Sequence, residues 1–178
     1  MSSEVEARTR RWLRDCILAL ELCPFAAPVV ADESLRVVVS TGETREQQLQ
    51  AFLQELDLLQ GSEESEVSTT LLALARGPEE FDDFLDLQEQ AQALLEQAGL
   101  EGLVQLVGFH PHYCFEGEAP ESPSHFTNRS PFPTLHLLRE AMLTRVLASY
   151  PDPAAIPERN IERLEELGRA AVERLWGL

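Results

Sequence analysis

Apolar residues recur along this chain at two spacings, and each spacing indicates which secondary structure its segment forms. Near the N-terminus they fall on one helix face, at Leu13, Cys16, Ile17 and Leu20. This alternation of three and four residues predicts a helix over residues 4–21. The helix ends before Pro24, because a residue that precedes proline is pushed towards extended geometry.

Short runs rich in valine, leucine and threonine predict strands at residues 35–40, 67–75 and 103–109. A helix is expected between the first two strands, opening at Thr44, because Thr44 and Gln47 can form a capping box. A second helix is expected to follow Pro78 and to end at Gly99, since glycine favours the position just after a helix.

The rest of the sequence predicts a long loop and two helices, one over residues 131–149 and one that opens at Asp152 or Pro157. Strands that alternate with helices of this length are typical of parallel pairing. We predict a layered α/β fold over residues 1–178 as a single domain, with a small, mainly parallel sheet of at least three strands and about five helices. The alternative is a ferredoxin-like α+β fold with one more, unrecognised strand and largely antiparallel pairing.

The net charge of the chain disfavours some classes of binding partner. Acidic residues number 31 and basic residues 14, which gives a net charge of −17, and every basic residue is an arginine. Such a charge repels phosphate backbones, so we expect no nucleic-acid partner. The absence of lysine also excludes Schiff-base chemistry and the lysine of a phosphate-binding loop.

The cysteines and the apolar runs indicate where the protein acts. Cys16, Cys23 and Cys114 form an odd set without a pairing pattern, which suits a reducing cytosol. The N-terminus lacks the apolar core of a signal peptide, and no run approaches the roughly 20 apolar residues of a membrane span. We expect a cytoplasmic protein without membrane contact, and its oligomeric state stays open.

Residues 108–140 concentrate the candidate chemistry, since they hold all four histidines. Ser130 is expected to cap a helix that begins at Pro131, and free N–H groups at a helix start bind anions. A guanidinium beside such a cap suits carboxylate or phosphate. We therefore assign ligand binding to Asn128, Arg129, Ser130, His136, Arg139 and Glu140. In the alternative interpretation these residues only cap the helix and tie down the preceding loop.

Catalytic roles are expected for Cys23, His110 and Tyr113. His110 follows the third strand, where ligands bind in open parallel sheets, and its ordinary pKa suits acid–base work. The C-terminal end of a helix raises the pKa of a thiol there, so Cys23 becomes a nucleophile only if an imidazole reaches it. Tyr113 would supply a phenolic donor. A buried structural cysteine is the alternative for Cys23.

A metal site is a further alternative. His110, His112 and Cys114 alternate, so in a straight strand they point to one side, and Cys23 or His125 could complete a zinc site. The spacing matches no established zinc signature, so we assign no metal ligands and no other cofactor.

Three motifs, LCPFA, FHPxYxF and NRSPFPxLHLLRE, resemble a bacterial family designated domain of unknown function 1415. The similarity covers nearly the whole chain. The matching positions are Cys23, Pro24, Phe25, Phe109, His110, Pro111, Tyr113, Phe115, Asn128, Arg129, Ser130, Pro131, His136, Arg139, Glu140, Arg159 and Asn160. His112 and Cys114 fall at open positions, which weakens the metal hypothesis. The resemblance implies no particular activity.

The preferred hypothesis is one polar pocket in which arginines hold a small acidic ligand. Cys23 and His110 would then support an acyl-transfer or hydrolytic reaction. The alternatives are a non-catalytic metabolite-binding or regulatory domain and a metal-binding protein, so whether the protein is an enzyme stays open.

Overall fold

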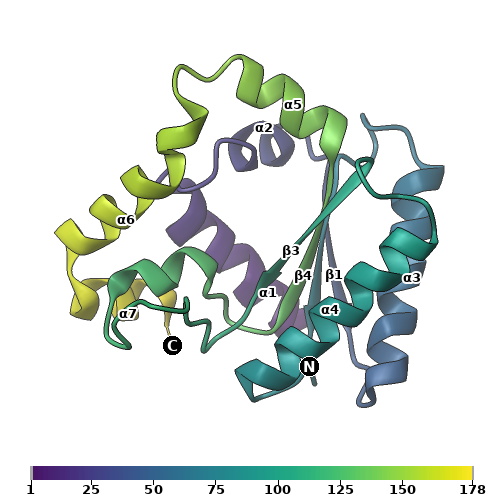
Figure 1. Ribbon diagram of the computed structural model, residues 1–178, viewed down its shortest axis with the longest axis horizontal. Helices are drawn as coiled ribbons and strands as arrows, with labels where there is room; N and C mark the ends of the chain where they lie inside the picture. The colour runs from purple at the N-terminus through teal and green to yellow at the C-terminus, as the bar shows by residue number, and fades with distance from the viewer. Residues whose placement is uncertain (1, 178) are drawn as a thin grey trace.

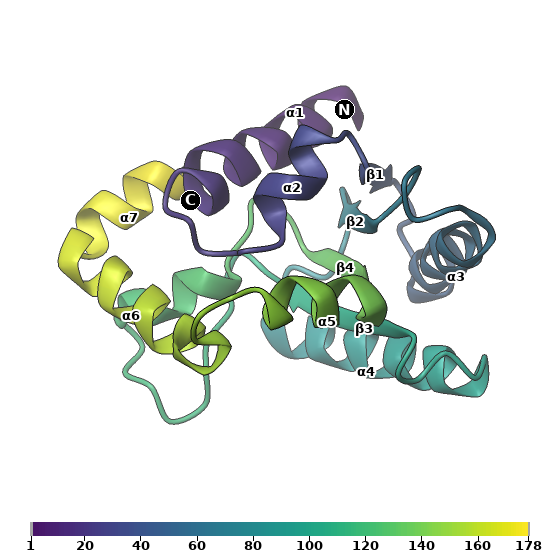
Figure 2. The same ribbon diagram turned by 90° about the horizontal axis from the view of Figure 1, so that it is seen from above.

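A mixed sheet separates two layers of helices in the computed structural model, which describes residues 2–177 (Figures 1 and 2). Its strands are β1 (Leu35–Ser40), β2 (Thr69–Leu74), β3 (Val104–Phe109) and β4 (Thr134–Arg139), in the spatial order β1-β2-β4-β3. The α/β class predicted from the sequence is confirmed.

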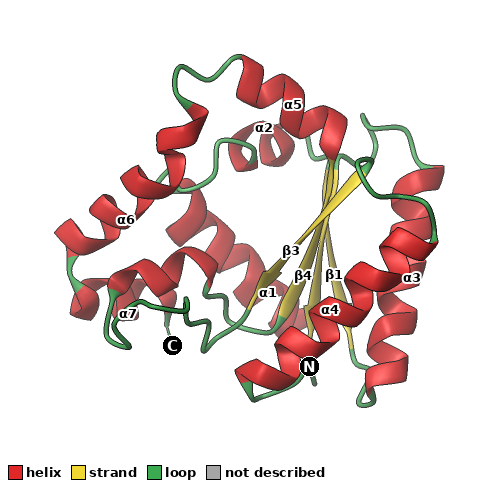
Figure 3. Cartoon of the chain, in the orientation of Figure 1, coloured by secondary structure: helices red, strands yellow, loops and turns green. Residues whose placement is uncertain are grey.

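Helices make up most of the remaining chain (Figure 3). The α-helices are α1 (Ser2–Trp12), α2 (Ala26–Ala31), α3 (Arg45–Gly61), α4 (Phe81–Gln97), α5 (Glu140–Ala148), α6 (Ile156–Leu167) and α7 (Arg169–Trp176). A π-helical segment, η1 (Leu13–Leu18), continues α1, and 3₁₀ segments form η2 (Pro123–Asn128) and η3 (Pro153–Ala155). Within residues 2–177, none of these helices has the length and apolar character that crossing a membrane requires.

Several local predictions are confirmed because short-range chemistry decides them. Strand β1 has the predicted bounds. The Thr44 side chain accepts from the Gln47 N–H, and the Gln47 side chain accepts from the Thr44 N–H, so the capping box forms. Gly99 follows α4 with a φ of 72°, a conformation that favours glycine.

The predicted helix over residues 131–149 is wrong in its first half, because Thr134–Arg139 forms β4. Leu135 and Leu137 alternate with His136, and this two-residue period fits a strand that lies between two neighbours. Pro131 and Pro133 lack N–H groups and fit the extended entry into this strand. Only Glu140–Ala148 remains helical.

The mainly parallel sheet is therefore also a wrong prediction. β1 and β2 are parallel, but β4 inserts between β2 and β3 and runs antiparallel to both. The ferredoxin-like alternative anticipated a missed strand and antiparallel pairing, yet its β-α-β-β-α-β order differs from the order here.

Different helices cover the two faces of the sheet (Figure 2). Helices α3 and α4 cover one face, where Phe52 and Phe84 pack against Leu135 and Leu137. The opposite face, which we call the cavity face, lies beneath the N-terminal helices, α5 and α6, and carries His136 on β4. Side chains alternate along a strand, so neighbouring β4 residues point to opposite faces of the sheet and pack against different helices.

The N-terminal helix is also less regular than predicted. After Trp12 the backbone hydrogen bonds join residues that are five apart instead of four, as in the 3.2 Å bond from the Ala19 N–H to the Arg14 carbonyl. Such π-helical turns occur frequently at functional sites. The short helix α2 was not expected, and the last predicted helix is divided into α6 and α7 at Gly168, whose φ is 74°.

Candidate functional site

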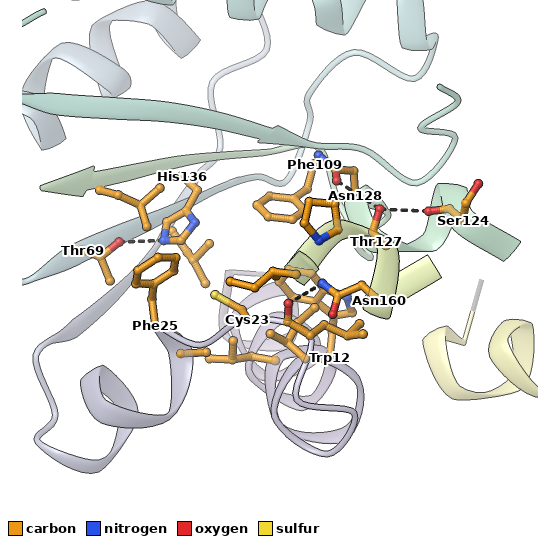
Figure 4. A pocket seen from close by; sticks show the side chains of 18 of the residues that line it. Trp12, Cys23, Phe25, Thr69, Phe109, Ser124, Thr127, Asn128, His136 and Asn160 are labelled. Carbon is orange, nitrogen blue, oxygen red and sulfur yellow. Dashed lines mark hydrogen bonds between the residues drawn. The ribbon is translucent and has the colours of Figure 1, made fainter. Parts of the chain in front are cut away.

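A cavity of about 620 Å³ lies between the cavity face and the helices that cover it (Figure 4). This volume is typical of pockets for small molecules, which are about 300–1,000 Å³. Its wall is mainly apolar and includes Trp12, Leu13, Ile17, Phe25, Leu71 and Phe109. Its polar lining residues are Cys23, Thr69, Glu116, Glu118, Ser124, Thr127, Asn128, His136 and Asn160.

Segments that are far apart in the sequence meet at this cavity. Of the residues assigned to a site from the sequence, Cys23, Asn128 and His136 line it, together with Phe25 and Phe109 from the same motifs. The remaining assigned residues, which are His110, Tyr113, Arg129, Ser130, Arg139 and Glu140, are not among its lining residues.

His136 provides a hydrogen-bond acceptor on the cavity face. Its Nε2 lies 2.6 Å from Thr69 Oγ1, and that hydroxyl donates its only proton to the Leu137 carbonyl at 2.7 Å. Thr69 must therefore accept from Nε2–H, which leaves Nδ1 of His136 unprotonated. Burial lowers the pKa of His136 to about 3, so the ring is neutral at physiological pH.

Cys23 contributes a neutral thiol to the same cavity. Burial raises the pKa of Cys23, and this effect exceeds the lowering by the backbone N–H groups of Phe25 and Ala26. A Cys–His catalytic pair needs a thiolate beside a protonatable imidazole. The opposite pKa shifts of Cys23 and His136 both disfavour that ion pair.

His110 is a structural residue rather than an acid–base group of the cavity. It is fully buried, its Nε2 lies 3.0 Å from the Pro78 carbonyl, and its Nδ1 accepts from the His112 N–H at 3.1 Å. Both ring nitrogens are thus engaged, and burial lowers the pKa of His110. Tyr113 packs beside it against Phe81, with 4.8 Å between ring centroids.

Arg129 and Ser130 do not form the expected anion site, because no helix begins at Pro131. Arg129 Nε donates to the Tyr113 carbonyl at 3.0 Å, and its guanidinium lies 4.5 Å from the centre of the Phe126 ring. Ser130 is fully buried and its Oγ donates to the Phe132 carbonyl at 2.6 Å. Both side chains stabilise the loop before β4.

Arg139 ties β4 to the end of α3. Its Nε donates to the Val67 carbonyl at 3.0 Å, and its Nη2 donates to the carbonyls of Leu59 and Ser62. A cation suits the negative end of a helix, where carbonyls lack intrahelical partners. In the predicted helix His136 and Arg139 would share a face, but residues three apart in a strand lie on opposite faces.

Glu140 does not line the cavity either. It is half-buried at the first position of α5, where an acidic side chain suits the positive end of the helix. Its backbone N–H donates to the Leu103 carbonyl at 3.0 Å.

The residues of the metal hypothesis do not converge on one site, although Cys114 Sγ lies 3.6 Å from His125 Nε2. His125 is fully buried, its Nδ1 accepts from the Phe115 N–H at 3.1 Å, and its Nε2 lies 2.8 Å from the Ala119 carbonyl. Cys114 and His112 are exposed. Residues 2–177 contain no group of three or more His, Cys, Asp or Glu residues that could hold a metal ion.

Cavity residues that escaped the sequence assignment include Trp12, Thr69 and Asn160. Asn160 is buried, and its Nδ2 donates to the Leu22 carbonyl at 2.6 Å, which fixes α6 beside the turn that carries Cys23. The match of Asn160 to the family pattern was the available signal. Trp12 and Thr69 look like ordinary core positions in the sequence.

Comparisons with known proteins identify a family without assigning an activity. No curated protein and no solved structure matches the chain. The family model described as "Protein of unknown function (DUF1415)" matches residues 4–174, which confirms the resemblance that the three motifs indicated. The chain therefore belongs to the DUF1415 family.

Proposed function

We propose that the protein binds a small, mainly apolar, uncharged molecule in the cavity between the sheet and helices α1, α2 and α6. The observation that carries this proposal is the lining of the cavity. Its wall is mainly apolar, and its polar groups are a thiol, hydroxyls, amides and an imidazole, with carboxylates from Glu116 and Glu118. Such a lining favours binding through burial of apolar surface, with a few polar groups that set orientation.

Charge argues against the acidic ligand that the sequence indicated. None of the arginines in residues 2–177 lines the cavity, and Glu116 and Glu118 contribute negative charge at exposed positions. An anion that leaves water without a cationic partner loses a large part of its solvation energy. A neutral molecule avoids this cost.

Binding is also favoured over acyl transfer. Cys23 and His136 share the cavity, but burial keeps the thiol protonated and the imidazole neutral. The cavity thus offers hydrogen-bonding groups rather than an activated nucleophile.

Two probes with the same phenylalkyl body separate these possibilities. We expect the neutral 4-phenylbutan-2-one to raise the melting temperature, because a ligand that binds only the folded state stabilises it. The anionic 3-phenylpropanoate is expected to raise it less. A larger shift with the carboxylate would contradict the proposal.

A matched pair of variants locates the binding. Cys23→Phe fills part of the cavity and is expected to abolish the shift with the ketone. Cys114→Phe places the same side chain at an exposed position outside the cavity and should retain the shift. Circular dichroism of both variants confirms that they fold before the comparison is made.

A further inference from the structure

Trp12 has a buried hydrogen-bond donor that the protein does not use. The residue is 4% exposed and lines the cavity, and its Nε1 has no hydrogen-bond partner among the described residues. Trp176 is equally buried, but its Nε1 donates to the Arg129 carbonyl at 2.9 Å. Buried donors are almost always paired, so the free N–H of Trp12 points to an acceptor that is not part of the chain.

His136 supplies the complementary group in the same cavity. Thr69 engages its Nε2–H, so Nδ1 is left as an acceptor. Figure 4 shows Trp12 on the helical side and His136 on the sheet, with the Cys23 side chain between them in this view. One donor and one acceptor therefore belong to different walls of the cavity.

We infer that Trp12 and His136 determine ligand specificity: the bound molecule presents a carbonyl or ether oxygen to Trp12 Nε1–H and a hydroxyl or N–H group to His136 Nδ1. This inference rests on the proposed function, since it defines the polar groups of the same uncharged ligand. Its apolar body packs against Phe25 and Phe109, which line the space. Uncharged amides, lactams and hydroxyketones of this size have the required combination of groups.

The physical basis is the cost of leaving such groups unpaired. The indole N–H of Trp12 is already buried without a partner, and an apolar ligand in the cavity would remove water from the free imidazole nitrogen without compensation. A ligand with matching groups restores both hydrogen bonds. Sites of this kind reject analogues that lack the matching groups more strongly than analogues that differ in apolar size.

Two-dimensional ¹⁵N–¹H NMR tests the donor directly, because the chain has two tryptophans and therefore two indole signals. With 4-phenylbutan-2-one, which is an acceptor only, we expect the Trp12 indole signal to move downfield. The Trp176 signal should stay in place, because its N–H is already bonded within the protein. A Trp12→Phe variant assigns the two signals.

A second probe tests the acceptor. 3-Phenylpropanamide has nearly the same shape as the ketone but adds N–H donors, so its binding should also move the ¹⁵N resonance of His136 Nδ1. The ratio of amide to ketone affinity is expected to fall by about fivefold in His136→Phe, the effect of losing one neutral hydrogen bond. The ratio should be unchanged in His112→Phe, because His112 is exposed and does not line the cavity.

The outcomes separate this inference from the proposed function. If both probes shift signals of Phe25 and Leu71 but leave the Trp12 indole and the affinity ratio unchanged, binding stands and the assigned specificity is wrong. If neither probe shifts any cavity signal, the proposed function fails, and the inference fails with it.

Discussion

His136 Nε2 lies 2.6 Å from Thr69 Oγ1, and this contact joins two antiparallel neighbours, β4 and β2, on the cavity face. The Thr69 hydroxyl also donates to the Leu137 carbonyl, so it holds the histidine in one tautomer. A threonine on one strand thereby decides which ring nitrogen of His136 can contact a ligand.

Thr69→Val should destabilise the protein by about 1–2 kcal/mol, because it removes two buried hydrogen bonds and leaves His136 Nε2–H and the Leu137 carbonyl less well paired. Urea denaturation measures the loss. Long-range ¹⁵N NMR of His136 should show a single neutral tautomer in the unsubstituted protein and a mixture in the variant.

Thr70→Val is the matched control, since Thr70 is the next residue and is fully buried. Its Oγ1 has no hydrogen-bond partner among the described residues. Replacing an unpaired hydroxyl by a methyl group of similar shape is expected to be neutral or stabilising. Equal destabilisation by both variants would show that the hydrogen bonds of Thr69 do not contribute measurably to stability.

The stability of the protein should fall in mild acid because His136 resists protonation when folded. Burial lowers the pKa of His136 to about 3, against about 6.5 for an exposed histidine, so between these values the unfolded chain binds more protons. The free energy of unfolding therefore decreases as the pH falls through this window, by up to about 1.4 kcal/mol per pH unit. Urea denaturation from about pH 7 to 4.5 measures the slope.

His136→Gln should make that slope shallower, because it removes the group that gains a proton on unfolding. His110 adds a contribution of the same sign, since burial also lowers its pKa, and this part remains in the variant. An unaltered slope in His136→Gln would mean that this ring is protonated in the folded protein.

The part of the fold that was predictable from the sequence depends on local chemistry. The Thr44–Gln47 capping box and the β1 run need only neighbours along the chain. Strand β4 depends on β2 and β3, which pair with it from both sides. The sequence after Ser130 also resembles the start of a helix, and only tertiary pairing overrides that local signal.

The candidate site also combines features that the local sequence indicates with features that only tertiary contacts determine. All three motifs contribute to the cavity lining, two of them through the assigned residues Cys23, Asn128 and His136 and the FHPxYxF motif through its two phenylalanines. Their roles were less predictable, because a polar side chain gives no indication of whether backbone carbonyls already satisfy it. Arg139 binds three carbonyls, and His110 has both ring nitrogens engaged. Such partners come from other elements, so only the folded chain identifies them.

Arg139→Met is expected to lower the free energy of unfolding by about 2–4 kcal/mol. The variant keeps an apolar stem but leaves the carbonyls of Val67, Leu59 and Ser62 without their charged donor. Urea denaturation measures this loss. The affinity for the neutral ketone probe should change little, because Arg139 does not line the cavity.

Arg145→Met tests whether the loss of stability expected for Arg139→Met comes from its buried hydrogen bonds or merely from removing a positive charge. Arg145 is exposed and pairs with the Glu64 carboxylate, and surface pairs of this kind contribute about 0–1 kcal/mol. A similar loss in both arginine variants would contradict a structural role specific to Arg139.

Thiol labelling should distinguish the three cysteines by their surroundings. Burial raises the pKa of Cys23 and raises that of Cys16 to about 12, whereas Cys114 is exposed. Because the thiolate is the reactive form, single-cysteine variants at about pH 7 should react with maleimide fastest at Cys114 and at least about tenfold more slowly at Cys23. Mass spectrometry of timed samples measures these rates.

Ligand protection connects this reactivity to the cavity. Bound 4-phenylbutan-2-one should slow the labelling of Cys23, which lines the cavity, and leave the rate at Cys114 unchanged. Equal rates at Cys23 and Cys114 without ligand would reveal an activated thiol. That result would favour covalent catalysis over simple binding, because an activated thiol requires a charge or proton acceptor that stabilises the thiolate.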